Sequence, residues 1–154
     1  MIISNDAINI EIFNTPKLVD DYNKEIKSSI NEFVQAFKIT EVKLDISFCT
    51  KDEIKDLNKK FRNKEAPTNV LSFPDIAFQG IRENCMGEII ISMDVIEEEV
   101  LDTSKREIDH LIHLLIHSML HLLGYKHDLE NDAILMERKE IEFLSKIGIQ
   151  NPYK

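Results

Sequence analysis

The stretch "HSMLHLLGYKHD", residues 117–128, contains three of the five histidines of this chain. His117 and His121 stand four residues apart, a spacing that places two side chains on one face of a helix. Gly124 is well placed to end that helix, because glycine readily adopts the left-handed conformation common at helix C-termini. The two residues that follow give the chain room to turn back and bring His127 to the same point.

Three histidines that converge in this way predict a metal site. Three imidazole ligands leave a fourth position open, which is the arrangement of catalytic zinc sites and not of closed structural ones. Zinc is the expected ion, although nickel, copper and iron also accept imidazole ligands. The sequence therefore predicts one metal ion bound by His117, His121 and His127.

The two remaining histidines, His110 and His113, precede this set on the same predicted helix. His113 and His121 are eight residues apart, or about 12 Å along a helix axis, which is too far for one ion. His113 and His117 could share a helix face, but no further histidine offers them a convenient third ligand. We therefore expect His110 and His113 to be structural, with His113 about one turn below the site.

Four segments have the hydrophobic pattern of strands. Residues 8–13 and 42–49 alternate apolar and polar side chains, residues 69–73 lie between two prolines, and residues 87–92 are mostly apolar. A loop or a hairpin connection is expected between the last two segments. These strands predict one mixed four-stranded sheet.

Helices are predicted between and after these strands. Their start signals are Thr15 followed by Pro16, a capping box opened by Thr50, a second box opened by Ser104, and Asn131. The predicted helices cover residues 15–38, 51–61, 94–101, 104–123 and a last amphipathic segment after 131. We predict an α+β fold: a single domain over residues 1–154, with helices packed on the sheet and the metal site at the end of a central His-rich helix.

Composition and charge restrict the possible functions. The chain has 154 residues, which suits one domain, and a formal net charge of −9, which disfavours non-specific binding of nucleic acid. An RNA-binding surface would therefore need a local basic patch. The segment "KKFRNK", residues 59–64, is the candidate, with Lys59, Lys60 and Lys64 as its lysines and Arg62 as its arginine.

The cysteines and the apolar segments point to a cytoplasmic protein. Cys49 and Cys85 form neither a disulfide framework nor a thiolate zinc site, as expected in a reducing compartment. The N-terminal segment lacks the pattern of a signal peptide. The most apolar stretch is interrupted by histidines and is shorter than the roughly 20 residues of a membrane span, so no membrane association is expected.

Three motifs in this chain resemble those of one protein family. "HSMLHLLGYKHD" resembles the H-G-x-L-H-L-x-G-Y-D-H motif of the bacterial YbeY endoribonucleases. "FRNKEAPTNVLSFP" (61–74) resembles their arginine followed by a P-T-D/N-V-L-S-F-P segment, and "MGEIIIS" (86–92) their G-D-I-x-I strand. The motifs occur in the order and spacing of the family. Two positions depart from it: Ser118 replaces a glycine, and Lys126 replaces an aspartate that could orient a ligand histidine, a loss that Asp128 could offset.

The resemblance implies a function and a site. His117, His121 and His127 match the zinc ligands, and Arg62 matches an arginine used in activity near the metal, so Arg62 and His117 are the expected catalytic residues. The implied activity is a metal-dependent, single-strand-specific endoribonuclease that acts in 16S rRNA 3′-end maturation and ribosome quality control in the cytoplasm. The implied partners are single-stranded RNA, an rRNA precursor, and the ribosome or its associated proteins.

Two other functions are compatible with a three-histidine site. A zinc peptidase would carry a glutamate directly after the first histidine, where this chain has Ser118. Glu88 could replace that base only if it faces the metal. A non-catalytic ribosome-assembly or protein-binding module, in which zinc only fastens the last loop, would unfold when a ligand is removed.

Overall fold

The structure is a computed structural model, and it describes residues 1–75 and 80–154. Strands and helices are interspersed along the chain without strict alternation. Their order is β1 (Ile2–Ser4), β2 (Ile8–Phe13), α1 (Lys17–Asp21), α2 (Asn23–Ala36), β3 (Glu41–Cys49), α3 (Lys51–Arg62), β4 (Val70–Pro74), β5 (Asn84–Ser92), α4 (Met93–Val100), α5 (Glu107–Leu122) and α6 (Glu130–Lys146).

The strands form one mixed sheet in the order β1-β2-β3-β5-β4. The inner strands β2, β3 and β5 are parallel, whereas β1 and β4 pair antiparallel with their neighbours. The predicted α+β class with a mixed sheet is confirmed, but four strands is wrong, because the sheet has five. Strand β1 gives a weak signal in the sequence, since it has three residues and buries only Ile3. Strands β4 and β5 pair as a hairpin would, although residues 76–79 of the predicted connection lie outside the described residues.

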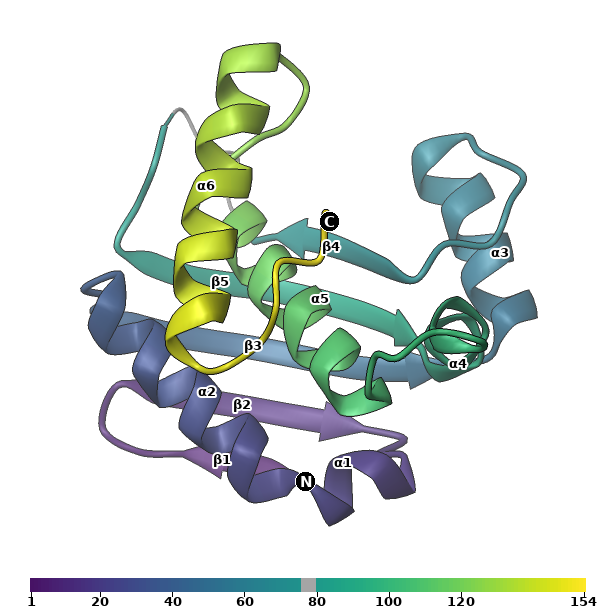
Figure 1. Ribbon diagram of the computed structural model, residues 1–154, viewed down its shortest axis with the longest axis horizontal. Coiled ribbons are helices and arrows are strands. Elements are labelled where there is room, and N and C mark those ends of the chain that lie inside the picture. The colour runs from purple at the N-terminus through teal and green to yellow at the C-terminus, as the bar shows by residue number, and fades with distance from the viewer. Residues whose placement is uncertain (76–79) are drawn as a thin grey trace.

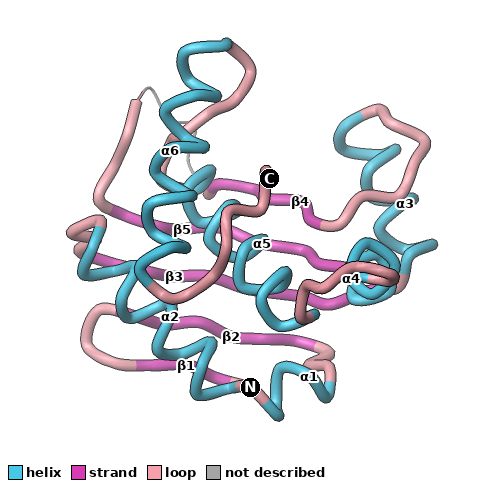
Figure 2. The backbone as a smooth tube through the Cα atoms, in the orientation of Figure 1, coloured by secondary structure: helices cyan, strands magenta, loops and turns pink. Residues whose placement is uncertain are grey.

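The two faces of the sheet differ in what covers them. Along β3, Val42, Leu44 and Ile46 are buried while Lys43 and Asp45 are exposed, which is the alternation of a strand with one covered face. Figure 1 shows helices α2, α5 and α6 over the covered face, and Figure 2 shows the strands behind them as a single layer. In the described ranges, no helix has the length and apolar character needed to cross a bilayer.

Helix α5 lies at the centre of the core, and eleven of its sixteen residues are buried. It contacts strands β4 and β5 on one side and helices α2, α4 and α6 on the others. A helix surrounded in this way can be apolar on almost every face. The packing therefore fixes the position of its last two turns, which carry the histidines.

One of the four predicted helix starts is confirmed. The side chain of Thr50 accepts a hydrogen bond from the amide of Glu53 at 3.2 Å, and the Glu53 carboxylate accepts one from the Thr50 amide at 3.1 Å. These are the two reciprocal bonds of a capping box. Helix α3, which it opens, ends at Arg62.

The other three predicted starts are wrong. Helix α5 begins at Glu107 without a side-chain cap and not at the predicted Ser104 box, and Arg106 just before it forms ion pairs with Asp109 and Glu25. Helix α6 begins at Glu130, one residue before Asn131. Neither Thr15 nor Pro16 supplies a side-chain cap. The helix predicted from residue 15 is two helices, α1 and α2, and at their junction the side-chain amide of Asn23 donates to the carbonyl of Asp20.

Candidate metal centre

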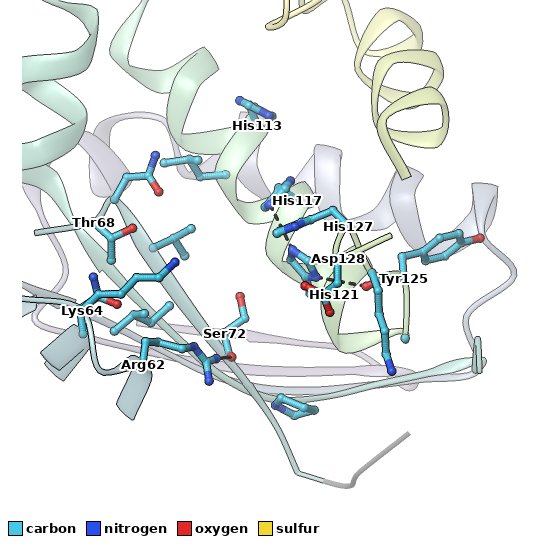
Figure 3. Close-up of a pocket in the computed structure, with 18 of the residues that line it drawn as sticks. Arg62, Lys64, Thr68, Ser72, His113, His117, His121, Tyr125, His127 and Asp128 are labelled. Atoms are coloured by element: carbon cyan, nitrogen blue, oxygen red, sulfur yellow. Dashed lines mark hydrogen bonds between the residues drawn. The ribbon is translucent and has the colours of Figure 1, made fainter. Parts of the chain in front are cut away.

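The end of α5 and the turn after it bring three histidines together. His117 and His121 lie on the last two turns of the helix, and His127 follows the turn. One ring nitrogen from each of the three lies within 4.8 Å of the others. Figure 3 shows the three rings converging on one point, with His113 further back along α5.

The turn between the second and third histidines is a Schellman motif. The amide of Tyr125 donates to the carbonyl of Leu120 at 3.1 Å, and the amide of Gly124 donates to the carbonyl of His121 at 3.0 Å. These two bonds define the motif, which needs a residue with a positive φ angle at its centre. Gly124 has φ +104°, and a Cβ atom at this position would collide with the backbone oxygen of Gly80. Gly124 therefore ends the helix as predicted and directs the chain towards His127.

Replacing Gly124 with alanine is expected to lower the free energy of unfolding of the metal-free protein by about 1–3 kcal/mol, because the substitution adds backbone strain and a collision. Urea denaturation followed by circular dichroism measures this change. Gly148→Ala is the matched control, since Gly148 also has a positive φ angle but a Cβ atom there would meet no described atom within 4 Å. An equal loss in both variants would contradict a role for the close approach of Gly80.

The hydrogen bonds of His117 and His121 orient their free nitrogens towards each other. The Nδ1–H of His121 donates to the carbonyl oxygen of Tyr125 at 3.1 Å, and the Nδ1–H of His117 donates to the carboxylate of Glu140 at 2.8 Å. Each neutral ring then keeps its lone pair on Nε2. The two Nε2 atoms face each other at 3.2 Å. Two lone pairs at this distance repel unless a cation lies between them.

This geometry fits a metal ion. Two imidazole nitrogens bound to one tetrahedral zinc at 2.0–2.1 Å lie about 3.3 Å apart, close to the separation of the two Nε2 atoms. Burial first, and the neighbouring His117 and His127 next, lower the pKa of His121 to about 4. The ring is therefore neutral at pH 7, as a metal ligand must be.

Glu140 is a site residue that sequence reasoning missed. Its carboxylate is fully buried and accepts hydrogen bonds from His117, from Nε2 of His113 at 3.0 Å and from the hydroxyl of Tyr153 at 2.7 Å. Burial alone would raise the pKa of Glu140, but these hydrogen bonds outweigh burial and hold the pKa at about 2. The carboxylate is thus ionised, and it gives His117 the partner that metal-ligating histidines usually have.

A signal for Glu140 was present in the sequence of α6. Ile134 and Leu135 are apolar but exposed, and the buried residues of the helix are Met136, Glu140, Phe143 and Leu144. Spacings of three and four residues connect these buried positions, so Glu140 interrupts an otherwise apolar stripe. A carboxylate at such a position requires a buried polar partner.

The remaining predicted histidines and the basic segment take different places. His113 lies one turn below the site, and His110 bonds Glu99 at 3.0 Å. Arg62, at the end of α3, donates to the carbonyl oxygen of Ser72 at 2.8 Å, and its guanidinium lies 5.0 Å from the centre of the Phe73 ring. The basic segment thus reaches the edge of the sheet next to the histidines.

Arg62 and the three histidines line one open cavity of about 920 Å³. Lys64 also lines it, whereas Lys59 pairs with Glu65 at 3.4 Å and Lys60 lies over the ring of Phe61, both away from the described cavity lining. In Figure 3, Arg62, Lys64 and Ser72 lie on the side of the cavity opposite the histidines. The structure therefore brings together the three predicted ligand histidines, Arg62 and one of the three predicted lysines.

Comparison with known proteins identifies the family. Residues 9–148 match the family described as Endoribonuclease YbeY. The chain belongs to the YbeY endoribonuclease family. It is 41% identical over 135 residues to the Endoribonuclease YbeY of Colwellia psychrerythraea, an alignment that covers 88% of this chain and 82% of that one. It is 34% identical over 152 residues to the Endoribonuclease YbeY of Francisella tularensis subsp. novicida, covering 96% and 94% of the two chains.

A solved structure agrees with this assignment to the YbeY family. The solution structure of a Thermotoga maritima protein superposes with a TM-score of 0.66 at 28% sequence identity, covering 90% of this chain and 88% of that one. The expectation that the chain is a metal-dependent hydrolase of this family is confirmed at the level of the family and of the candidate histidine site.

The two departures from the YbeY motif leave the site geometry intact. Ser118 is fully buried one turn before Leu122, which packs against Gly87 of β5, so this position faces the sheet and requires a small residue. An acidic residue at position 126 is not needed to orient these two histidines. His117 bonds Glu140, and His121 bonds the carbonyl of Tyr125. Lys126 instead lines the cavity.

Proposed function

We propose that this chain is a metal-dependent endoribonuclease that cleaves single-stranded RNA, with one zinc ion bound by His117, His121 and His127. The observation that carries the proposal is that these histidines and Arg62 line the same open cavity. Maturation of the 16S rRNA 3′ end and ribosome quality control in the cytoplasm are the processes that the family suggests. An rRNA precursor, the ribosome and its associated proteins are the corresponding partners.

The residues of the cavity suit a phosphodiester substrate. The zinc ion would supply Lewis acidity towards an oxygen of the scissile phosphodiester. Arg62 uses one N–H on Ser72, and a guanidinium has further donors in a planar fork that match the oxygens of a phosphate. The buried Glu140 fixes the orientation of the His117 ring through Nδ1. We assign the electrostatic stabilisation of the pentavalent transition state to Arg62.

The charge of the cavity supports RNA binding by an acidic chain. Arg62, Lys64 and Lys126 line it, and Asp128 is the one carboxylate among its described lining residues. The net charge of the chain is −9, so the cavity has the opposite sign from the molecule as a whole. A phosphate backbone is therefore attracted to the site and repelled elsewhere, which favours productive encounters.

The geometry disfavours the peptidase alternative. Glu88 is exposed and faces away from the histidines, because it shares its side of β5 with Ile90, while the alternate residues Ile89 and Ile91 pack in the core with α5. Ser118 is buried against the sheet. A peptide substrate that binds as an added strand would hydrogen-bond to the backbone of the edge strand β4. The carbonyl of Ser72 on that strand already accepts a hydrogen bond from Arg62.

A cleavage assay on the purified protein tests the proposal. Equal amounts of single-stranded RNA, double-stranded RNA and casein are incubated with the protein before chelation, after chelation and after zinc is restored, with elemental analysis of each sample. We expect cleavage of single-stranded RNA alone, lost on chelation and regained with zinc. Cleavage of casein, or RNA cleavage that survives complete removal of metal, would refute the proposal.

A further inference from the structure

Glu140 carries a fully buried carboxylate beside the three-histidine site, and one of its oxygens lies within 4.8 Å of a ring nitrogen of His113 and of His117. It is 0% exposed, and every hydrogen bond that it receives from the described residues comes from His113, His117 or Tyr153. No lysine or arginine of the described chain forms an ion pair with it. An ionised carboxylate is costly to bury in this way unless its donors are held in place.

The three donors come from two segments of the chain. His113 and His117 stand one turn apart on α5, and Tyr153 belongs to the C-terminal tail after α6. Figure 1 shows this tail running from the end of α6 back along α5. The Tyr153 hydroxyl lies 2.7 Å from one carboxylate oxygen, and the tyrosine ring packs edge-on against His113 at 5.9 Å. Glu140 therefore joins α5, α6 and the tail at one point.

The hydrogen bonds also determine which nitrogens carry protons. The Nδ1 atom of His113 is buried and has no partner among the described residues, so this nitrogen suits a bare lone pair and Nε2 carries the proton donated to Glu140. In His117 the proton is on the other nitrogen, because Nδ1 is the nitrogen that donates to the carboxylate. One carboxylate thus holds two histidines on adjacent turns in opposite tautomers. Only the tautomer of His117 leaves its Nε2 unprotonated, and this atom faces His121.

We propose that Glu140 is the positioning residue of the metal centre: it holds His117 in the Nδ1–H tautomer with Nε2 directed at the metal, and Tyr153 of the C-terminal tail holds Glu140. The inference rests on the proposed metal site and adds α6 and the tail to it. A carboxylate behind a ligand histidine orients the ring and increases its basicity, and its removal commonly weakens metal binding ten- to a hundredfold.

Glu140→Gln tests the proposal with little change in shape. We expect zinc affinity, measured by competition with a chromophoric chelator, to fall ten- to a hundredfold, and the visible absorption of the cobalt-substituted protein to change. Tyr153→Phe leaves the bond between Glu140 and His117 in place, so a smaller loss in the same direction is expected. Glu142→Gln is the matched control, because Glu142 is exposed on the same helix, and its affinity should equal that of the wild type.

Three outcomes would count against the proposal, the metal site on which it rests, or the assigned tautomer. If Glu140→Gln melts at a lower temperature but binds zinc as tightly as the wild type, the proposal is wrong. Failure of the wild type itself to bind zinc would overturn the proposed metal site instead. Should Glu140→Gln not fold, long-range ¹H–¹⁵N spectra of the wild-type imidazoles decide the matter, because a proton on Nε2 of His117 in the metal-free protein contradicts the assigned tautomer.

Discussion

Replacing His121 with alanine is expected to abolish zinc binding and to lower the rate of RNA cleavage by at least about a thousandfold, since metal catalysis supplies several kcal/mol of transition-state stabilisation. His121 is the most informative ligand to remove. Among the described residues, its Nδ1 bonds only the backbone of Tyr125, whereas removal of His117 would also take a donor from the buried Glu140. Elemental analysis and single-turnover cleavage of single-stranded RNA measure the two effects.

The stability of the His121→Ala protein distinguishes a catalytic metal from a structural one. One side of the triad opens into the cavity, as in a catalytic site, so we expect the variant to remain folded by circular dichroism at 25 °C. His110→Ala serves as the control, because His110 lies on the same helix and bonds Glu99 outside the site. An unfolded His121→Ala protein would favour a module that uses zinc only to fasten its last loop.

Replacing Arg62 with alanine is expected to lower kcat by about 10²- to 10³-fold without loss of bound zinc, as when one group that stabilises transition-state charge is removed. Arg62 lines the cavity, and its hydrogen bond to Ser72 and its contact with the Phe73 ring are both on β4, so metal content and catalysis should separate in this variant. Arg62→Lys should recover only part of the rate, because an ammonium cannot bind two phosphate oxygens with a planar fork.

A control variant tests whether the effect of Arg62 comes only from the positive charge of helix α3. Lys55 is exposed on α3 and lies outside the described lining of the cavity, so Lys55→Ala should cleave RNA at the wild-type rate. A similar loss in Lys55→Ala and Arg62→Ala would indicate general attraction of RNA to α3. Loss of zinc from Arg62→Ala would indicate that Arg62 supports the metal centre and does not act on the phosphate.

The parts of the site that follow from local sequence were predictable. The spacing of His117 and His121, the stop at Gly124 and the return to His127 involve eleven consecutive residues, and the helix period with one turn motif fixes their arrangement. The class of fold was predictable for a similar reason, because strands such as β3 and helices such as α3 carry their patterns within themselves.

The parts that depend on contacts between distant segments were not predictable from spacing. Glu140 joins the site only because α6 packs across α5, and Tyr153 only because the tail folds back. Strand β1 is defined by its pairing with β2 and not by its own three residues. The start of α5 was misplaced because the helix begins without a side-chain cap, while Arg106 before it pairs with Glu25, far away in the sequence.

The hydrogen bond between Arg62 and the Ser72 carbonyl also bears on the behaviour of the protein at high concentration. Strand β4 is at the edge of the sheet, where unpaired backbone groups can recruit a strand from another molecule and start aggregation. A charged side chain laid on that edge blocks such pairing. We therefore expect the arginine that we assign to phosphate binding to hinder association of the chain through β4 as well, so that an exchange at this position alters both properties together.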